Sequence, residues 1–189
     1  MRASAGRAGS HMVPDLDAAF LAGIKEELAS IEENEKNIQA LSQVFRYYAK
    51  HARQLAQVLF KFLTQQCFPW ELIHALNLLD DILLLDSTGQ YRAELAERVD
   101  TVAVSAFRKV PSDQEKREVA RMLLTWQELK IFDAATLEAI REKIRGGSDA
   151  AARILLEAAL AMEEDEAALP EPSSGPEAAR AEGEAAAPR

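Results

Sequence analysis

The chain has 189 residues and a formal net charge of −9, from 22 Lys and Arg against 31 Asp and Glu. This balance lacks the basic excess that is typical of proteins that bind duplex nucleic acid. No apolar run approaches the roughly 20 residues that a membrane-spanning helix needs. The single Cys67 cannot form an internal disulfide, so the composition favours a reduced compartment, the cytosol or the nucleus.

The two ends of the chain differ in composition from its middle. Residues 1–12 end in Gly-Ser-His-Met and are interpreted as a leader introduced by cloning. Residues 170–189 are mostly Pro, Ala, Glu and Gly, which cannot bury enough apolar surface to offset the entropy of ordering them. We therefore expect one monomeric helical domain over residues 13–147, an additional C-terminal helix over 148–169 and a disordered tail over 170–189.

Apolar residues recur every three or four positions almost everywhere, which is typical of α-helices. Pro14 is expected to start the first helix, and Pro69 to lie in the first turn of another, which ends at the Ser-Thr-Gly of residues 87–89. A single helix is predicted to run from about Tyr91 to Phe107. About eight helices and no strand are expected, an all-α fold in which helices stack as a superhelix.

The motifs of enzymes and of metal or cofactor sites are missing from this sequence. It has no Gly-rich phosphate loop, no His-Glu-x-x-His and no pair of cysteines. His51 and His74 are interpreted as surface or core-edge residues, and Cys67 as a small apolar packing residue rather than a nucleophile. We therefore expect a binding protein without catalytic activity, cofactor or metal.

Asp80 and Asp81 interrupt the most apolar predicted helix, in the run Leu-Leu-Asp-Asp-Ile-Leu-Leu-Leu of residues 78–85. Adjacent helical residues point about 100° apart, so the two carboxylates cannot share one narrow exposed stripe. A carboxylate buried alone is costly, so at least one of them is expected to face a concave surface where a ligand binds. The structural alternative is an aspartate bonded to a neighbouring helix end or to an arginine.

Arg121 interrupts a second apolar stretch, and Arg117 lies four residues earlier on the same helix face. Two guanidinium groups on one face can hold a phosphate through charge-assisted hydrogen bonds. The alternative is a solvated face, because Lys116 and Glu118 flank Arg117.

Three segments in order resemble the C-terminal-domain-interacting domain (CID) family. They are Asn-Ile-Gln-Ala-Leu-Ser at 37–42, Leu-Asn-Leu-Leu-Asp-Asp-Ile at 76–82 and Ala-Arg-Met-Leu-Leu-Thr-Trp-Gln-Glu-Leu-Lys-Ile-Phe at 120–132. The last is the most specific, with its arginine, its tryptophan five residues later and its phenylalanine six residues after that. The resemblance covers about Asp15–Ile144 and implies eight helices in a right-handed superhelix, related to VHS and ENTH domains.

The resemblance also implies a nuclear, non-enzymatic partner-binding role. CID proteins bind the heptad tail of the largest RNA polymerase II subunit, in transcription termination, RNA 3′-end processing or transcription regulation. Asp80 matches the helix position that hydrogen-bonds the bound tail, and Asp81 matches the residue beside it. Arg121 matches the arginine that contacts the phosphate of the tail. In this reading Asp80 is solvated at the floor of the groove until the ligand supplies its partner.

The sequence departs from the family pattern at several positions of the expected groove. Asn77 stands where members usually have Tyr, and Leu85, Leu129 and Glu33 replace polar or basic residues, which implies a more apolar and less basic groove. One alternative is a VHS- or ENTH-like adaptor of membrane traffic, which the acidic first helix disfavours. Another is a scaffold that pairs Arg121 with Asp80 internally, or one that binds a partner without heptads.

Overall fold

The computed structural model describes residues 14–31 and 35–167, and the predicted leader, the predicted tail and Glu33 lie outside these residues. The described chain forms nine α-helices and no strand. They are α1 (Ala18–Ala29), α2 (Glu35–Tyr47), α3 (Ala52–Lys61), α4 (Leu72–Leu84), α5 (Gln90–Ala96), α6 (Val99–Lys109), α7 (Asp113–Glu128), α8 (Ala134–Arg145) and α9 (Asp149–Ala167). A short 3-10 turn precedes α3 at Ala49–His51, and a wider turn, η2, extends α3 over Phe62–Gln66.

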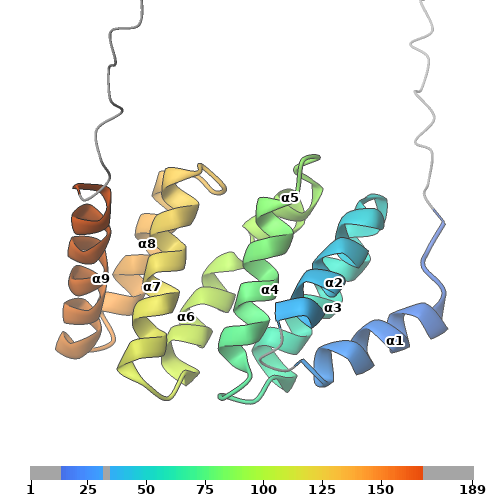
Figure 1. Cartoon of the computed structure of the whole chain (residues 1–189), viewed down its shortest axis with the longest axis horizontal. Coiled ribbons are helices and arrows are strands. Elements are labelled where there is room, and N and C mark those ends of the chain that lie inside the picture. The colour runs from blue at the N-terminus through green and yellow to red at the C-terminus, as the bar shows by residue number, and fades with distance from the viewer. Residues whose placement is uncertain (1–13, 32–34, 168–189) are drawn as a thin grey trace, which may run out of the picture.

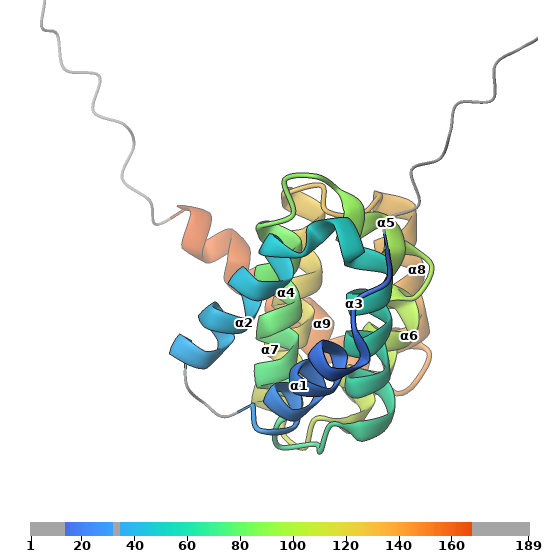
Figure 2. The ribbon, with the colours of Figure 1, turned by 90° about the vertical axis from the view of Figure 1, so that its right-hand side faces the viewer.

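The helices stand side by side in two layers (Figure 1). In one layer α4 lies between α2 and α7, and α7 also packs against α9. In the other layer, α3 and its extension η2 contact α5 and α6, and α6 contacts α8. Figure 2 shows the two layers from the side, with α1 crossing the end of the stack. The predicted all-α superhelix is confirmed.

Helix α4 forms the centre of the hydrophobic core, as its apolar sequence predicts. Eight of its thirteen residues are buried, on more than one face of the helix: Leu72, Ile73, Ala75, Leu76, Leu78, Leu79, Ile82 and Leu83. A helix that is apolar around most of its circumference is stable only between other elements. Contacts of α4 with α2, α5 and α7 supply this cover and leave one polar strip of α4 for the groove described below.

Three predicted helix boundaries differ from the observed ones. The first helix begins at Ala18 rather than near Pro14, because Asp17 caps it by accepting a hydrogen bond from the amide of Ala19 at 2.6 Å. Pro69 lies in the turn before α4, which begins only at Leu72.

The helix predicted from Tyr91 to Phe107 is in fact two helices, α5 and α6, which separate at residues 97–98. The apolar spacing continues through the break, and neither Gly nor Pro marks it. The break lets each helix pack in its own direction: the buried hydroxyl of Tyr91 donates to the carbonyl of Phe45 at 2.7 Å, while α6 turns toward α8.

A buried carboxylate organises the turn between α4 and α5. The side chain of Asp86 is fully buried and accepts hydrogen bonds from the amide of Arg92 at 3.0 Å and from the hydroxyl of Thr88 at 2.9 Å. The Arg92 guanidinium returns to the Asp86 carbonyl at 2.7 Å. Gly89 adopts φ 70°, the left-handed conformation that glycine permits without a Cβ clash. The predicted end of the helix at residues 87–89 therefore depends on Asp86, which the sequence pattern did not single out.

Helix α7 ends in a left-handed residue that is not glycine. The amide of Ile131 donates to the carbonyl of Trp126 at 2.8 Å, and that of Lys130 to the carbonyl of Gln127 at 3.1 Å. This pair of hydrogen bonds is the Schellman motif, which requires a left-handed residue directly after the C-cap. Lys130 fills that position with φ 54°, although a residue with a Cβ is disfavoured there.

Replacing Lys130 by glycine should therefore stabilise the protein. We expect Lys130→Gly to raise the free energy of unfolding by about 0.5–1 kcal/mol, because relief of the left-handed strain exceeds the added entropy of the unfolded chain. Urea denaturation followed by circular dichroism measures the change. Lys130→Ala is the matched control: it removes the same charge but keeps Cβ, and an equal gain with alanine would show that strain is not the cause.

Candidate functional site

A groove of about 760 Å³ opens between α2, α4 and α7. Its lining residues come from the three helices and from the turns before α4 and α7: Ile38, Gln39, Trp70, Ile73, His74, Asn77, Asp81, Ser112, Gln114, Glu115 and Glu118. His74, Asn77 and Asp81 of α4 lie three and four residues apart, so they share one face of that helix. The predicted groove residues Asn77 and Asp81 both line it.

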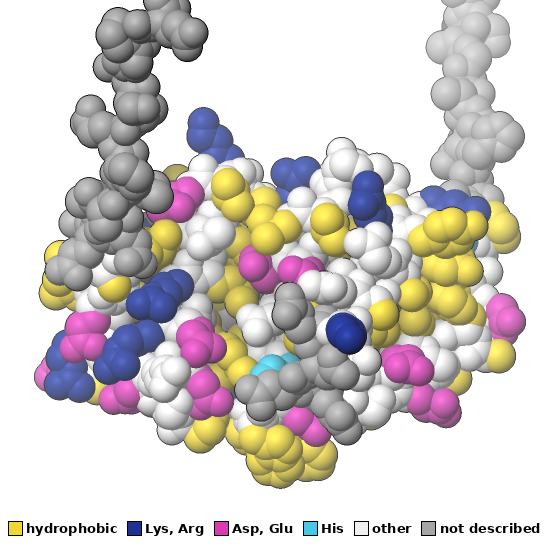
Figure 3. Space-filling model, in the orientation of Figure 1, with side chains coloured by type: hydrophobic (Ala, Val, Ile, Leu, Met, Phe, Trp, Pro, Cys, Tyr) yellow, Lys and Arg dark blue, Asp and Glu magenta, His cyan; other side chains and the backbone are white. Residues whose placement is uncertain are grey.

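The groove is polar and acidic. Asp81, Glu115 and Glu118 line it, and none of its described lining residues is Lys or Arg. Figure 3 shows acidic side chains in the middle of this face, and Lys and Arg side chains both along the upper rim and, among further acidic ones, toward α9. Glu115 also closes the capping box of α7, because it accepts hydrogen bonds from the amide and the hydroxyl of Ser112 at 3.0 and 2.6 Å.

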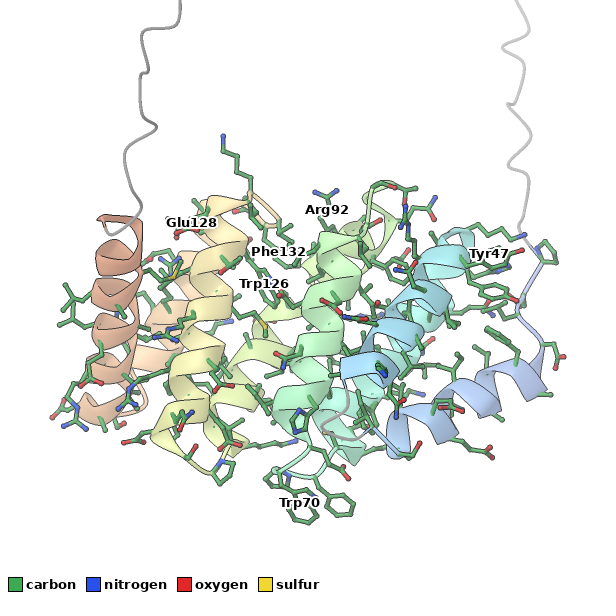
Figure 4. The ribbon with its side chains drawn as sticks, in the orientation of Figure 1. Tyr47, Trp70, Arg92, Trp126, Glu128 and Phe132 are labelled. Carbon is green, nitrogen blue, oxygen red and sulfur yellow. The ribbon has the colours of Figure 1, made fainter. Side chains whose placement is uncertain are left out.

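Asp80 faces α7 rather than lining the groove. Its Oδ1 accepts a hydrogen bond from the indole Nε1–H of Trp126 at 2.6 Å. Trp126 is buried and packs edge-on against Phe132 with ring centroids 5.5 Å apart, and Figure 4 shows both rings between α4 and α7. The expectation that Asp80 has no internal partner in the free protein is therefore wrong. Its partner is a tryptophan, neither of the two alternatives considered from the sequence.

Burial raises the pKa of the Asp80 carboxyl above its ordinary value of 3.8. The Trp126 indole opposes this rise in pKa because it hydrogen-bonds the ionised form, and the neighbouring Asp81 adds to it through charge repulsion. Ionisation of Asp80 therefore lowers the free energy of unfolding, and the hydrogen bond from the indole makes this loss smaller.

The two candidate phosphate ligands on α7 have different surroundings. Arg117 donates from Nε to Oε2 of Glu157 on α9 at 3.1 Å, and both side chains are half-exposed. Arg121 is exposed and makes no ion pair or hydrogen bond with any side chain that the structure describes. The internal pair of Arg121 with Asp80 that the scaffold hypothesis requires is absent from the described residues. Arg117 must exchange Glu157 before it can hold a phosphate.

Sequence reasoning missed the aromatic end of the groove. Trp70 is 64% exposed, and Phe68 stacks on it with ring centroids 4.7 Å apart and planes 4° from parallel. Adjacent Cys67 is buried as predicted, and burial with the nearby Glu71 raises its pKa to about 12, so the thiol stays protonated. The Phe-Pro-Trp run between two helices was the available signal, because a turn can leave large aromatic rings outside the core.

His74 belongs to the groove wall, a position that helical periodicity alone did not distinguish from any other surface site. Within residues 14–31 and 35–167, no three His, Cys, Asp or Glu side chains gather to hold a metal ion. Over the same residues no helix combines the length and the apolar character needed to cross a membrane.

A family model described as CID domain matches residues 22–140. Among solved structures, the fold is similar to that of the yeast Nrd1 CID in complex with Sen1 NIM1, with a TM-score of 0.57 and 16% sequence identity. That match covers 67% of this chain and 99% of the yeast chain. Residues 22–140 contain α2, α4 and α7, the three helices that line the groove.

Curated relatives include the regulation of nuclear pre-mRNA domain-containing protein 1A of mouse, 23% identical over 82% of this chain, and of human, 22% identical over the same share. The chain spans about half the length of these relatives, 50% in each case. A 40% identical match to the pyridoxal 5′-phosphate synthase subunit PdxS of Pyrococcus furiosus covers only 39% of this chain and 22% of that protein. It is too partial to bear on the fold.

The bond between Asp80 and Trp126 predicts a contrast between two substitutions. Asp80→Ala removes the acceptor and leaves a buried indole N–H unpaired, so we expect a loss of about 1–3 kcal/mol in the free energy of unfolding. Asp80→Asn keeps an acceptor oxygen and removes the partly desolvated charge, so we expect no loss at pH 7. Urea denaturation compares the two variants, and equal destabilisation by both would contradict the hydrogen-bond account.

The raised pKa of Asp80 also predicts a pH dependence. Well below pH 3.8 the carboxyl is protonated in both states, and its ionisation costs folding nothing. As the pH rises above 3.8 the unfolded chain ionises first, so the cost to the free energy of unfolding grows until the pH exceeds the folded-state pKa. The stability of Asp80→Asn relative to the natural protein should therefore increase from pH 3.5 to pH 7, measured as the difference between their denaturation midpoints.

Proposed function

We propose, because the chain belongs to the CID domain family, that its groove binds the phosphorylated C-terminal tail of the largest RNA polymerase II subunit. CID domains are protein-interaction modules that bind peptide partners in transcription and RNA processing. The family assignment takes precedence over the alternative of a VHS- or ENTH-like adaptor in membrane traffic. In this proposal the protein acts in the nucleus as a non-enzymatic adaptor, consistent with the names of its relatives.

The observation that carries the phosphate part of the proposal is the state of Arg121. It is an exposed guanidinium on α7, one helical turn beyond the groove residue Glu118, and no described side chain engages it. Placing a long cationic side chain without an ion-pair partner beside a groove favours a ligand anion as its partner. Arg117 is a second phosphate ligand if the anion displaces Glu157, which is feasible because that ion pair is half-exposed.

The groove residues have separate roles in this proposal. Asn77 and Asp81 line the groove and present amide and carboxylate groups to the backbone or hydroxyl groups of a bound peptide. Asp80 contributes mainly by holding Trp126, and with it α7, in place. The second oxygen of Asp80 can also accept a hydrogen bond from an N–H or O–H group of the peptide, because the structure records the indole on Oδ1 alone.

A second candidate ligand is a segment of another protein without phosphorylated heptads. Two observations favour it: the structurally similar yeast domain is described in complex with Sen1 NIM1, and no Lys or Arg is among the described lining residues of the groove. The two candidates differ in whether phosphate contributes to affinity, so one experiment separates them.

We expect Arg121→Ala to weaken binding of a phosphorylated two-heptad peptide about tenfold or more, and to change binding of the unphosphorylated peptide little. Fluorescence anisotropy with labelled peptides measures both dissociation constants. The matched control is Arg53→Ala on α3, in the layer of helices that does not line the groove, where an exposed arginine is lost with the same change in charge. Equal weakening of both peptides by Arg121→Ala would favour the second candidate, and binding of neither peptide would refute the proposed ligand.

A further inference from the structure

A second cavity, separate from the groove, lies where the ends of four helices meet. It has a volume of about 400 Å³ and shares no lining residue with the groove. The lining of this cavity, the α9 pocket, comes from the last turn of α6, the start of α7, the end of α8 and the first turns of α9: Phe107, Arg108, Lys116, Ile144, Gly147, Ser148, Ala150, Ala151 and Ile154. A cavity of this size is large enough for a small organic group.

The charged residues that line the α9 pocket, among those that the structure describes, are both cationic. Arg108 is exposed, and no described side chain pairs with it. Lys116 pairs with Asp113, but its Nζ lies 3.4 Å from the carboxylate, farther than the roughly 2.8 Å of a strong charge-assisted bond. Asp113 and Asp149, the acidic residues beside the pocket in the sequence, do not line it. The pocket therefore has a positive potential that favours an anion.

The floor of the α9 pocket is apolar. Its side chains are all buried in the core: Phe107, Ile144, Ala151 and Ile154. Ser148 lies at the rim, where its Oγ accepts a hydrogen bond from the amide of Ala151 at 3.1 Å, and its hydroxyl hydrogen can donate to a ligand. A bare inorganic ion would leave the apolar floor in contact with water. The lining therefore fits an anionic group that is attached to an apolar one better than it fits a simple ion.

We infer that the α9 pocket binds an organic phosphate, with the phosphate between Arg108 and Lys116 and an aromatic ring on the buried floor. A phosphate dianion carries enough acceptor oxygens for both cations and for the Ser148 hydroxyl. A phosphorylated tyrosine side chain and a free aryl phosphate share this chemistry. The inference does not depend on the function proposed for the groove. Most of the pocket lining lies beyond residue 140, where the family match ends, so the family does not assign this site.

The direct test is a titration of phenyl phosphate into the whole chain, followed by nitrogen-15 NMR. The chain carries Arg121→Ala throughout, so that the phosphate contact proposed for the groove does not contribute. We expect saturable shifts of the backbone amides of residues 147–151 at millimolar concentration. Inorganic phosphate, which lacks the ring, and benzyl alcohol, which lacks the charge, should each bind about fivefold more weakly.

Substitutions in the lining provide the matched controls. Arg108→Ala and Lys116→Ala should each weaken phenyl phosphate about three- to fivefold, whereas Arg53→Ala on α3 should not. Ala150→Glu places a carboxylate in the exposed first turn of α9, where it favours the helix but repels an anion, so binding should be lost while the fold is kept. Ala135→Glu makes the same change in the first turn of α8, outside the pocket lining, and should leave binding unchanged.

A second probe, acetyl-Gly-phosphotyrosine-Gly-amide, distinguishes the two sources of the ligand. Binding of this tripeptide at least as tight as that of phenyl phosphate supports a phosphorylated side chain of a protein, and much weaker binding supports a free aryl phosphate. Three results would overturn the inference: equal affinity for inorganic and phenyl phosphate, binding that survives Arg108→Ala and Ala150→Glu unchanged, or shifts spread evenly over the surface. Each leaves the proposed function standing, because the pocket and the groove share no lining residue.

Discussion

Trp126 is 1% exposed, and its indole N–H lies inside the protein. A buried donor without an acceptor costs about 1–3 kcal/mol, so its partner is not optional. Asp80 supplies the acceptor from α4, and this bond joins the two helices that form most of the groove wall. Ring packing of Phe132 against Trp126 adds the segment after α7 to the same unit. The position of the groove therefore depends on a polar contact in an otherwise apolar interface.

The sequence predicts the helices well because their stability depends on periodic apolar burial, a local pattern. The apolar run of α4 predicted its burial, which the structure confirms. Ser112 and Asp133, residue types that commonly cap helices, cap α7 and α8. The separation of α5 from α6 was not predictable, because the apolar period continues through residues 97–98. The break depends on the packing of each helix against helices that are distant in the sequence. The role of Asp86 was not predicted for the same reason, because Thr88 and Arg92 reach its carboxylate only when the chain turns from α4 into α5.

Apolar periodicity did not predict which way the side chains of the candidate site point. It placed Asp80 and Asp81 on a helix that faces a groove, but it did not predict that Asp80 bonds Trp126 while Asp81 lines the groove. That distinction depends on the rotation of α4 relative to α7, a tertiary property. Pairing of Arg117 with Glu157 likewise joins residues forty positions apart on α7 and α9. The acidic character of the groove also arises only when residues of α4 and α7 are brought together.

The chain contains two tryptophans, and their surroundings make them distinct optical reporters. Trp126 is enclosed and bonded to a carboxylate, whereas Trp70 is 64% exposed at the end of the groove. Emission from Trp126 should be blue-shifted and insensitive to acrylamide until the protein unfolds, because quencher cannot reach it. Emission from Trp70 should be red-shifted and readily quenched, and any molecule that covers the end of the groove should protect it. A single unlabelled sample thus reports global unfolding and local occupancy through separate parts of one spectrum.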